Sequence, residues 1–505
     1  MSSPFYITTP IYYVNDVPHI GHAYTTLACD VMARFKRLDD FEVFFLTGTD
    51  EHGQKVETAA NNKGLKPQDF VDDVSVNFRS LLKCMNFSND DFIRTTEKRH
   101  FNSCQRIWNK LVENGNIYLG KYSGWYAVRD EAFFLESEIV DGKAPSGAPV
   151  EWVEEPSYFF NLSKWQNKLL EYYDENKDFI CPNSRRNEVI SFVKGGLKDL
   201  SVSRTSFSWG IKVPNDEQHI MYVWLDALTN YLSACDYANN ENNMKNSKFW
   251  PADIHMVGKD IIRFHAVYWP AFLMAADLPL PKKVFAHGWW TNEGNKISKS
   301  LGNVINPFDL VEEYGVDQIR YFLMREVPFG NDGDFSKTQL NNRINSDLAN
   351  SYGNLFQRVV SMICKNCNKT IPQKPEFLNK EDLVLVNSLK DNIDDYRNLI
   401  DNQKFDQFLK NIWLVISSAN KYTDEQAPWS LKKTDFKRME VVLFTLIETL
   451  RQVSILLQPF LPNTTKSVLD QIKIPLNERN FKHLENIYKG EEKIELPEPL
   501  FPRVQ

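Results

Sequence analysis

The sequence has no run of 18 apolar residues, and this absence argues against a transmembrane helix. Its seven cysteines are odd in number and widely spaced, so they cannot all pair and predict no secreted disulfide framework. The first residues lack the basic and apolar regions of a secretory leader and the arginine-rich pattern of an organellar one. Together these absences favour a cytoplasmic protein.

The composition is that of an ordinary globular protein. Hydrophobic residues make up 42% and charged residues 25% of the 505 residues, which excludes wholesale disorder and a collagen-like fibre. A chain of this length predicts about three domains. The net charge of −7 argues mildly against a protein that coats nucleic acid. It leaves open the binding of RNA through local patches of lysine and arginine.

The first part of the chain alternates strand and helix patterns. A buried strand pattern over 4–8 is followed by helical apolar spacing over 27–35 and by a second strand pattern over 41–46. This order predicts a parallel α/β sheet. Short strands and turns rich in proline and glycine between about 117 and 218 indicate an inserted domain, after which the α/β pattern returns. Beyond about 345 the apolar spacing is helical.

Two short motifs place imidazole or ammonium groups beside glycine. His19-Ile20-Gly21-His22 lies at a predicted helix N-terminus, where free N–H groups and the helix dipole favour an anion. Gly21 allows a ligand to approach the backbone closely. Lys296-Ile297-Ser298-Lys299-Ser300 lies between Gly294 and Gly302, and its lysines suit a departing pyrophosphate. Either motif alone is also compatible with an ordinary loop.

The two motifs, in this order and separated by an insert, resemble the HIGH and KMSKS signatures of class I aminoacyl-tRNA synthetases. The first matches fully, whereas the second has Ile297 in place of methionine. Further segments are similar to methionyl-tRNA synthetases of the bacterial and organellar form: IYYVN at 11–15, GTDEHG at 48–53, YVWLDA at 222–227 and EQAPW at 425–429. The resemblance implies a methionine–tRNA ligase. It would activate L-methionine with ATP to methionyl-adenylate, release pyrophosphate and transfer methionine to the 3′ end of tRNA(Met).

The resemblance also predicts the fold class, which is α/β. A Rossmann-type parallel-sheet catalytic domain would be split by a connective insert and followed by an all-α anticodon-binding domain. The expected ranges are 1–116 and 219–289 for the two halves of the catalytic domain, 117–218 for the insert, 290–345 for the KMSKS loop and stem-contact region, and 346–505 for the helical domain.

The resemblance further implies a set of residues for ATP and for catalysis. The catalytic residues would be His19, His22, Lys296 and Lys299, which act by positioning and charge and not by covalent attack. The residues expected to bind ATP are His19, Gly21, His22, Gly258, Asp260, Lys296, Ser298 and Lys299. Asp260 would accept hydrogen bonds from the ribose hydroxyls.

A second set would bind the amino acid and a third set the anticodon. Asp50 would accept the methionine ammonium in a charge-assisted hydrogen bond, and the soft thioether would pack against aromatic faces. The expected methionine-binding residues are Ile11, Tyr13, Asp50, Trp224, Ala227, Tyr231 and His287. Asn354, Arg358 and Trp429 would read the anticodon through a stacked base and hydrogen bonds to base edges.

Cofactors and partners follow from the same resemblance. ATP would arrive with Mg²⁺, and tRNA(Met) and L-methionine would be the other partners, without a membrane. Many methionine enzymes carry a zinc knuckle, but its cysteines are missing here at Ala127 and Asp130, so no structural zinc is expected. Cys364 and Cys367 form a C-x-x-C without a second pair and are interpreted as incidental. The chain shows no appended tRNA-binding barrel, so a monomer is expected.

Two alternatives stay open. An RNA-binding paralogue without catalysis is disfavoured by the intact histidine, aspartate and lysine positions. A nucleotidyltransferase acting on a small molecule would leave about 160 C-terminal helical residues without a purpose.

Overall fold

The computed structural model describes residues 2–14, 17–130, 132–134, 136–238, 246–297 and 303–504. Of the predicted site residues, Ser298 and Lys299 lie outside these ranges, and the side chain of Lys296 is also outside what the structure describes. Within these ranges, no helix combines the length and the apolar character needed to cross a membrane.

A seven-stranded sheet forms the centre of the N-terminal part, and every pairing within it is parallel. The order is β2-β3-β1-β13-β14-β8, and β4 also pairs with β3. The first strand therefore lies beside a strand from beyond the insert, which confirms the predicted split parallel sheet. The strands are β1 (Pro4–Thr8), β2 (Tyr12–Tyr13), β3 (Glu42–Asp50), β4 (Asp91–Arg94), β8 (Ile180–Cys181), β13 (Ile254–Gly258) and β14 (Val284–His287).

Both faces of this sheet are covered by apolar side chains. Successive side chains of a strand point to opposite faces, so the two faces can be told apart by the core that each side chain joins. Phe5 and Ile7 belong to one apolar core, whereas Tyr6 between them belongs to another. The first core contains α1 (Ile20–Leu38), and the second contains α4 (Lys98–Glu113). The remaining helices of this half are α2 (Gln54–Asn62), α3 (Pro67–Cys84), α5 (Gln166–Glu175), α6 (Asn183–Lys194), α7 (Val223–Leu228), α8 (Asn230–Ser233) and α9 (Trp269–Ala275).

The predicted insert contains a four-stranded antiparallel sheet with the order β6-β5-β7-β9, and a smaller sheet with the order β10-β12-β11. It also supplies β8, which pairs with β14 of the central sheet. The predicted end of the insert at 218 falls within β12, so the domain ranges stay a prediction. The strands are β5 (Ile117–Ala127), β6 (Ala132–Phe134), β7 (Glu151–Phe160), β9 (Leu200–Ser201), β10 (Ser203–Arg204), β11 (Lys212–Val213) and β12 (Asp216–Met221).

A connecting region joins the sheet to the helical part. Its small sheet consists of β15 (Trp290–Asn292), β16 (Asn295–Lys296) and β17 (Gly333–Phe335). Its helices are α10 (Pro307–Tyr314), α11 (Val316–Arg325) and α12 (Lys337–Arg343). A π-helical segment, Ile344–Gly353, continues α12 directly into α13 (Asn354–Asn366). The helix therefore runs across the boundary predicted at residue 345.

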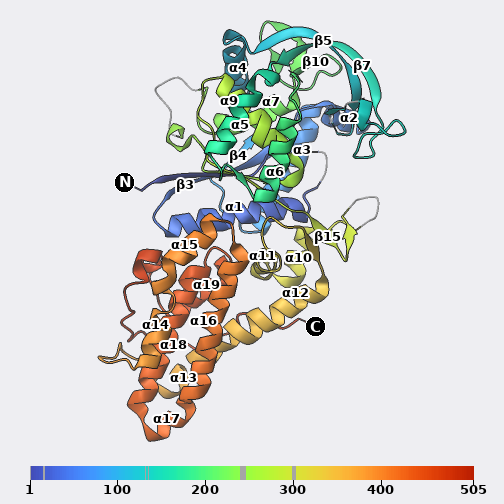
Figure 1. The fold of residues 1–505 in the computed structure, drawn as a ribbon. Helices are drawn as coiled ribbons and strands as arrows, with labels where there is room; N and C mark the ends of the chain where they lie inside the picture. The colour runs from blue at the N-terminus through green and yellow to red at the C-terminus, as the bar shows by residue number, and fades with distance from the viewer. Residues whose placement is uncertain are drawn as a thin grey trace.

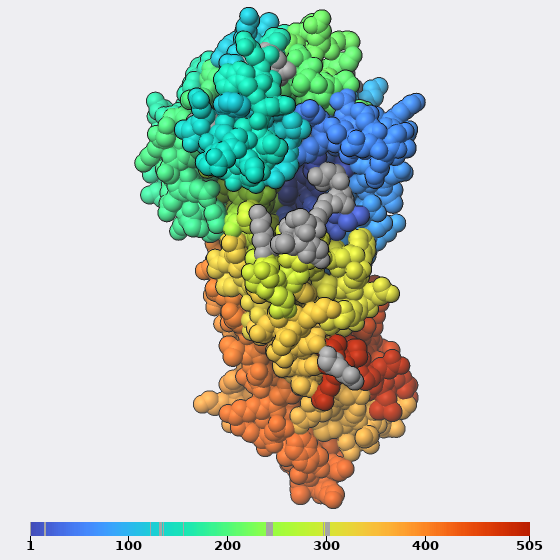
Figure 2. Space-filling model, turned by 90° about the vertical axis from the view of Figure 1, so that its right-hand side faces the viewer, coloured from blue at the N-terminus to red at the C-terminus, as the bar shows by residue number. Residues whose placement is uncertain are grey.

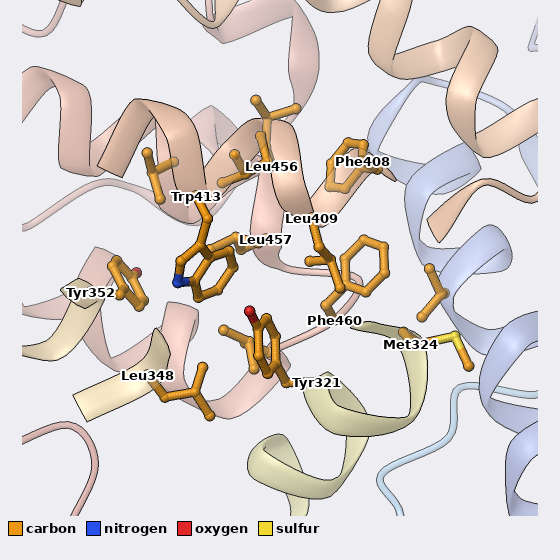
Figure 3. Packing of buried hydrophobic residues seen from close by; sticks show 14 of the residues in the cluster. Tyr321, Met324, Leu348, Tyr352, Phe408, Leu409, Trp413, Leu456, Leu457 and Phe460 are labelled. Atoms are coloured by element: carbon orange, nitrogen blue, oxygen red, sulfur yellow. The ribbon is translucent and has the colours of Figure 1, made fainter. Parts of the chain in front are cut away.

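The C-terminal part is helical, as predicted (Figure 1). Its core is continuous with that of α1, because Tyr321 and Met324 of α11 pack among Leu409 and Trp413 of α16 (Figure 3). Figure 2 shows the sheet with its insert and the helical part at opposite ends of an elongated molecule. The other helices are α14 (Lys380–Asn387), α15 (Ile393–Asp401), α16 (Phe405–Gln426), α17 (Pro428–Thr434), α18 (Phe436–Leu457) and α19 (Pro462–Gln471).

Candidate active site

Residues predicted from four distant segments meet at one edge of the central sheet. Since β1, β3, β13 and β14 are parallel, their carboxyl ends lie at the same edge. Asp50 ends β3, Gly258 ends β13 and His287 ends β14. The loop that follows β1 leads to His19 at the start of α1. Ligands of open α/β sheets bind at such an edge, and we therefore place the candidate active site here.

The two histidines at the start of α1 hold each other through a reciprocal cap. Nδ1 of His19 accepts the N–H of Gly21 at 3.0 Å, and Nδ1 of His22 accepts the N–H of His19 at 3.1 Å. The ring centroids are 4.0 Å apart. Because both Nδ1 atoms act as acceptors, the hydrogen-bond network places the proton of each neutral ring on Nε2. Each histidine thereby presents one N–H donor at a helix N-terminus.

The surroundings keep these rings neutral. Burial lowers the pKa of His19, although the charge of Asp260 acts in the opposite direction. Burial and the neighbouring His19 lower the pKa of His22 well below its ordinary value. Tyr12 and Phe78 contact the edge of the His22 ring, with centroid distances of 4.7 and 5.4 Å. At neutral pH the pair thus offers hydrogen bonds without carrying a positive charge.

The structure gives a steric reason for a glycine at position 21, which the motif alone did not reveal. A Cβ atom at this position would lie 2.9 Å from Cε1 of His19, closer than real Cβ contacts. The glycine therefore makes room for the His19 ring, which folds back over it. A direct contact of Gly21 with ATP stays a prediction.

The residues expected at the ribose lie just beyond β13. Asp260 is exposed in the turn after Gly258, and Nε1 of Trp289 donates a hydrogen bond to its carboxylate at 3.1 Å. A Cβ atom on Gly258 would approach the same carboxylate to 2.6 Å. Lys259 pairs with Asp332 at 2.6 Å and lies over the Trp289 ring at 4.3 Å. These contacts place Asp260 beside the end of β13.

Aromatic side chains pack around two of the residues predicted to bind methionine, Trp224 and Tyr231. Trp224 lies flat on Phe264, with centroids 3.6 Å apart and planes at 7°. The Tyr231 hydroxyl lies 2.7 Å from Nε2 of His265, whose Nδ1 donates to the carbonyl of Ile261 at 3.0 Å. Nε2 of His265 therefore accepts the Tyr231 proton. Ala227 is another residue predicted to bind methionine. It is buried in α7 and lies between Trp224 and Tyr231 in the sequence.

His265, which is not among the predicted site residues, lies beside two residues predicted to bind methionine. Its ring lies near both Trp224 and Tyr231, with centroid distances of 6.4 and 5.8 Å. His287, the histidine predicted for this pocket, hydrogen-bonds Thr25 of α1 at 2.7 Å and the Gly288 carbonyl, and its role there stays a prediction. The signal for His265 was its position on the first helical turns after the Gly258 strand end, four residues beyond Ile261.

The other predicted methionine contacts lie beside the end of β3. Tyr13 pairs in register with Asp50, which is buried. Ile11 is half-buried against the same core that includes Tyr231. Lys55 lies 5.2 Å from the Tyr13 ring. The structure thus brings Tyr13 and Asp50 together at the end of β3, with Ile11 two residues before Tyr13.

The segment that carries the lysine motif begins in the small sheet that follows β14. Lys296 pairs with Thr291 in the β15–β16 hairpin. Further along the chain, the carbonyl of Ile305 accepts the N–H of Ile20 at 3.1 Å. The backbone at Ile305 is therefore bonded directly to the first residue of α1, which is part of the histidine motif.

The predicted anticodon residues lie at the opposite end of the molecule. Trp429 in α17 is 45% exposed, and the Arg358 guanidinium lies 5.8 Å from its ring. Arg358 also pairs with Asp424 at 2.7 Å. Asn354, one helical turn before Arg358, is exposed. An exposed indole beside arginine suits the stacking of an unpaired base.

Metal-binding potential is concentrated in one place. Among the described residues, His100, Cys104 and Asp226 form the one group with the composition and spacing of a metal site. All seven cysteines are free. Ala127, which stands where a zinc-knuckle cysteine is expected in the family, packs with Ala144 and Ala148 in a small apolar cluster.

Comparisons with known proteins agree with this geometry. A family model described as class I tRNA synthetases (M) matches residues 5–151 and 144–360, and one for the anticodon-binding domain of methionyl tRNA ligase matches 371–505. The methionine–tRNA ligase of Rickettsia felis is 58% identical, over 100% of this chain and 99% of the relative, and that of Rhizobium meliloti is 54% identical, over 99% and 98%. A Mycobacterium tuberculosis methionyl-tRNA synthetase in complex with methionyl-adenylate superposes with a TM-score of 0.96 at 46% identity, over 99% of this chain and 100% of the other.

The split parallel sheet, the histidine motif at its edge and the helical C-terminal part define a class I aminoacyl-tRNA synthetase. The family follows from the full-length relatives and the matched models. The chain belongs to the methionyl-tRNA synthetases, and its activity is that of a methionine–tRNA ligase.

Proposed function

We propose that the crevice forms methionyl-adenylate through His19 and His22, before methionine is transferred to tRNA(Met). The reciprocal cap carries this proposal, because it fixes two neutral rings with their Nε2–H groups as donors. The methionine carboxylate attacks the α-phosphorus, and negative charge develops on the phosphate oxygens. Donors held in advance at that point stabilise the transition state without the cost of reorganising. No protein nucleophile takes part.

The rest of ATP is assigned to the strand ends and the lysine motif. Asp260 accepts hydrogen bonds from the ribose, and Gly258 leaves room for its carboxylate. Lys296, Ser298 and Lys299 stabilise the departing pyrophosphate by charge and hydrogen bonds. Mg²⁺ enters as part of the nucleotide substrate, held mainly by phosphate oxygens and water.

Methionine lies between Asp50 and the aromatic wall. Asp50 accepts the ammonium, while Ile11, Tyr13, Trp224, Ala227 and Tyr231 surround the side chain. His265 orients the Tyr231 hydroxyl by accepting its hydrogen bond. His287 contributes to this pocket from the end of β14. Its hydrogen bond to Thr25 connects this strand to α1. The M. tuberculosis relative, solved with methionyl-adenylate, supports a pocket that holds both substrates.

At the far end of the molecule, Trp429 stacks on an anticodon base, and Asn354 and Arg358 contact base edges. The cation–π contact between Arg358 and Trp429 supports this assignment, since it keeps the two side chains together.

The proposal also covers the metal content, the oligomeric state and the cellular compartment of the protein. The chain holds no structural zinc in its insert, because the apolar cluster around Ala127 offers no ligand at the knuckle position. It acts as a monomer in the cytoplasm. Atomic absorption and sedimentation at micromolar concentration test these points: stoichiometric zinc or a stable dimer would contradict them.

Methionine-dependent exchange between ATP and pyrophosphate is the most direct test of adenylate formation. We expect exchange with methionine, and charging of tRNA(Met) when tRNA is added. Absence of exchange with methionine would refute the proposed chemistry. Exchange without charging of tRNA(Met) would instead favour a nucleotidyltransferase acting on a small molecule.

A further inference from the structure

One fully buried carboxylate joins the two sides of the methionine pocket. Asp226 lies in α7, two residues after Trp224 and directly before Ala227. One of its oxygens lies 2.7 Å from Nδ1 of His52, and the other lies 2.7 Å from Nε2 of His100. His52 follows Asp50 by two residues at the end of β3, and His100 belongs to α4. All three groups are buried.

In this cluster both histidines act as donors and the carboxylate of Asp226 acts as the acceptor. An ionised carboxylate only accepts, so His52 and His100 each donate an N–H to Asp226. Although burial raises the pKa of Asp226, the two histidines lower it to about 2, and the group is ionised at neutral pH. Nδ1 of His100 hydrogen-bonds Ser233 of α8 at 2.9 Å. The helix that contains Tyr231 is therefore linked to the same carboxylate.

The cluster is better explained by hydrogen bonds than by a metal ion. The ligand atoms of His100, Cys104 and Asp226 lie within 4.8 Å of one another. However, Nε2 of His100 is already within 2.7 Å of Asp226 and 3.3 Å of Cys104 Sγ. A ring nitrogen that donates its proton to a carboxylate has no lone pair for a metal.

We propose that Asp226 is a positioning residue that fixes the span between the ammonium acceptor Asp50 and the aromatic wall at Trp224. The inference rests on the proposed roles of those two residues. The positioning role follows from where Asp226 lies. Its carboxylate accepts a hydrogen bond from His52, two residues after Asp50, and Asp226 belongs to the same helix as Trp224. The span sets the length of amino acid that the pocket accepts. Asp226 thereby contributes to the selection of methionine without touching it.

The test is Asp226→Asn in the full chain, assayed by ATP–pyrophosphate exchange. An amide offers one acceptor oxygen, so one of the two histidine N–H groups loses its partner. We expect the KM for methionine to rise about tenfold, as for the loss of one hydrogen bond to a charged group. The KM for ATP should stay within about twofold, since this change removes binding only on the amino-acid side. The preference for methionine over homocysteine, whose side chain is shorter by the terminal methyl group, should fall as well.

A matched control is Asp382→Asn. Asp382 is also fully buried and takes two hydrogen bonds from Arg438, but it lies in the helical part. We expect this variant to lose stability and to keep both KM values. An equal rise in the methionine KM for both variants would overturn the proposal, because the effect would then be general destabilisation. A parallel rise in the methionine and ATP KM values of Asp226→Asn would overturn it too.

A second pair of variants keeps the proposal testable if Asp226→Asn does not fold. His52→Gln retains an N–H donor for Asp226, whereas His52→Leu removes it. We expect His52→Gln to stay close to the parent chain and His52→Leu to raise the methionine KM. Equal KM values for the two variants would refute the positioning role. Failure of the proposed function has a different signature, since the parent chain itself would then show no methionine-dependent exchange.

Discussion

The two ends of the molecule hold their predicted site residues in opposite ways. At the sheet edge, His19 and His22 are fixed by reciprocal hydrogen bonds before any ligand arrives. At the end of the helical part, Trp429 is 45% exposed and its neighbour Arg358 pairs with an exposed carboxylate, Asp424. Chemistry on a small substrate requires groups that are already oriented, whereas a flexible RNA loop can adapt to an open surface.

A buried ion pair lies between these two ends. Arg320 of α11 bonds Asp30 of α1 at 2.6 Å, and also the carbonyl groups of Met85, Pro459 and Phe460. Both charged side chains are fully buried. The pair thus connects the helix of the histidine motif with the turn after α18. The predictions below test the contrast between buried, fixed groups and exposed, adaptable ones.

The largest effect is expected for Arg320→Met. Removing one partner of a buried ion pair costs about 3–5 kcal/mol of unfolding free energy. Asp30 keeps its pair with Arg34, but the carbonyl groups of Met85, Pro459 and Phe460 also lose their donor. Asp424→Asn, which breaks the exposed pair with Arg358, should cost no more than about 1 kcal/mol. Urea unfolding followed by circular dichroism measures both. Similar losses for the two variants would erase the distinction between the buried and the exposed pair.

The next effect concerns catalysis at the sheet edge. His22→Ala removes one preorganised donor, so exchange and charging should both fall by about 10²–10³-fold. His22→Gln is the control, because a glutamine can still accept the His19 N–H and offer a donor of its own. If His22→Ala lowered charging alone, the histidine pair would not act in adenylate formation.

A smaller effect is expected at the helical end. Trp429→Ala should weaken tRNA charging by about 1–3 kcal/mol, the usual contribution of one stacked base. Exchange without tRNA should be unchanged, in contrast to His22→Ala. Measuring kcat/KM for tRNA(Met) beside the exchange rate separates the two. An equal loss of both activities would show that Trp429 acts as a structural anchor.

The smallest change concerns pH. Burial lowers the pKa of His19 and of His22, so both rings stay neutral as the pH falls through the ordinary histidine value of about 6.5. The maximal exchange rate should therefore vary by less than about twofold between pH 8 and 6.5. Below that range the unfolded chain takes up protons before the folded one, so stability should decline with falling pH. An inflection of the rate near pH 6.5 would contradict the neutral, buried pair.

Elements with a strong local pattern were predictable. The alternation of strand and helix before residue 117 and the apolar spacing of α16 and α18 appear in the structure as the predicted parallel sheet and helical part. The histidine motif was found because its residues are contiguous and stand at a helix start. The same locality explains the misses: β8 joins the central sheet from within the expected insert, and no local pattern marks that pairing.

The sequence by itself determined the family, the α/β alternation of the first part, the helical character of the last part and the residue types of the two motifs, because these depend on contiguous motifs and on local periodicity. Only the tertiary structure decided which groups touch. It joined His265 to Tyr231, turned His287 towards Thr25 and bound Asp226 to two histidines from other elements. Such contacts span from 34 to 262 residues along the chain, and their partners are selected by packing and by the need to satisfy buried polar groups.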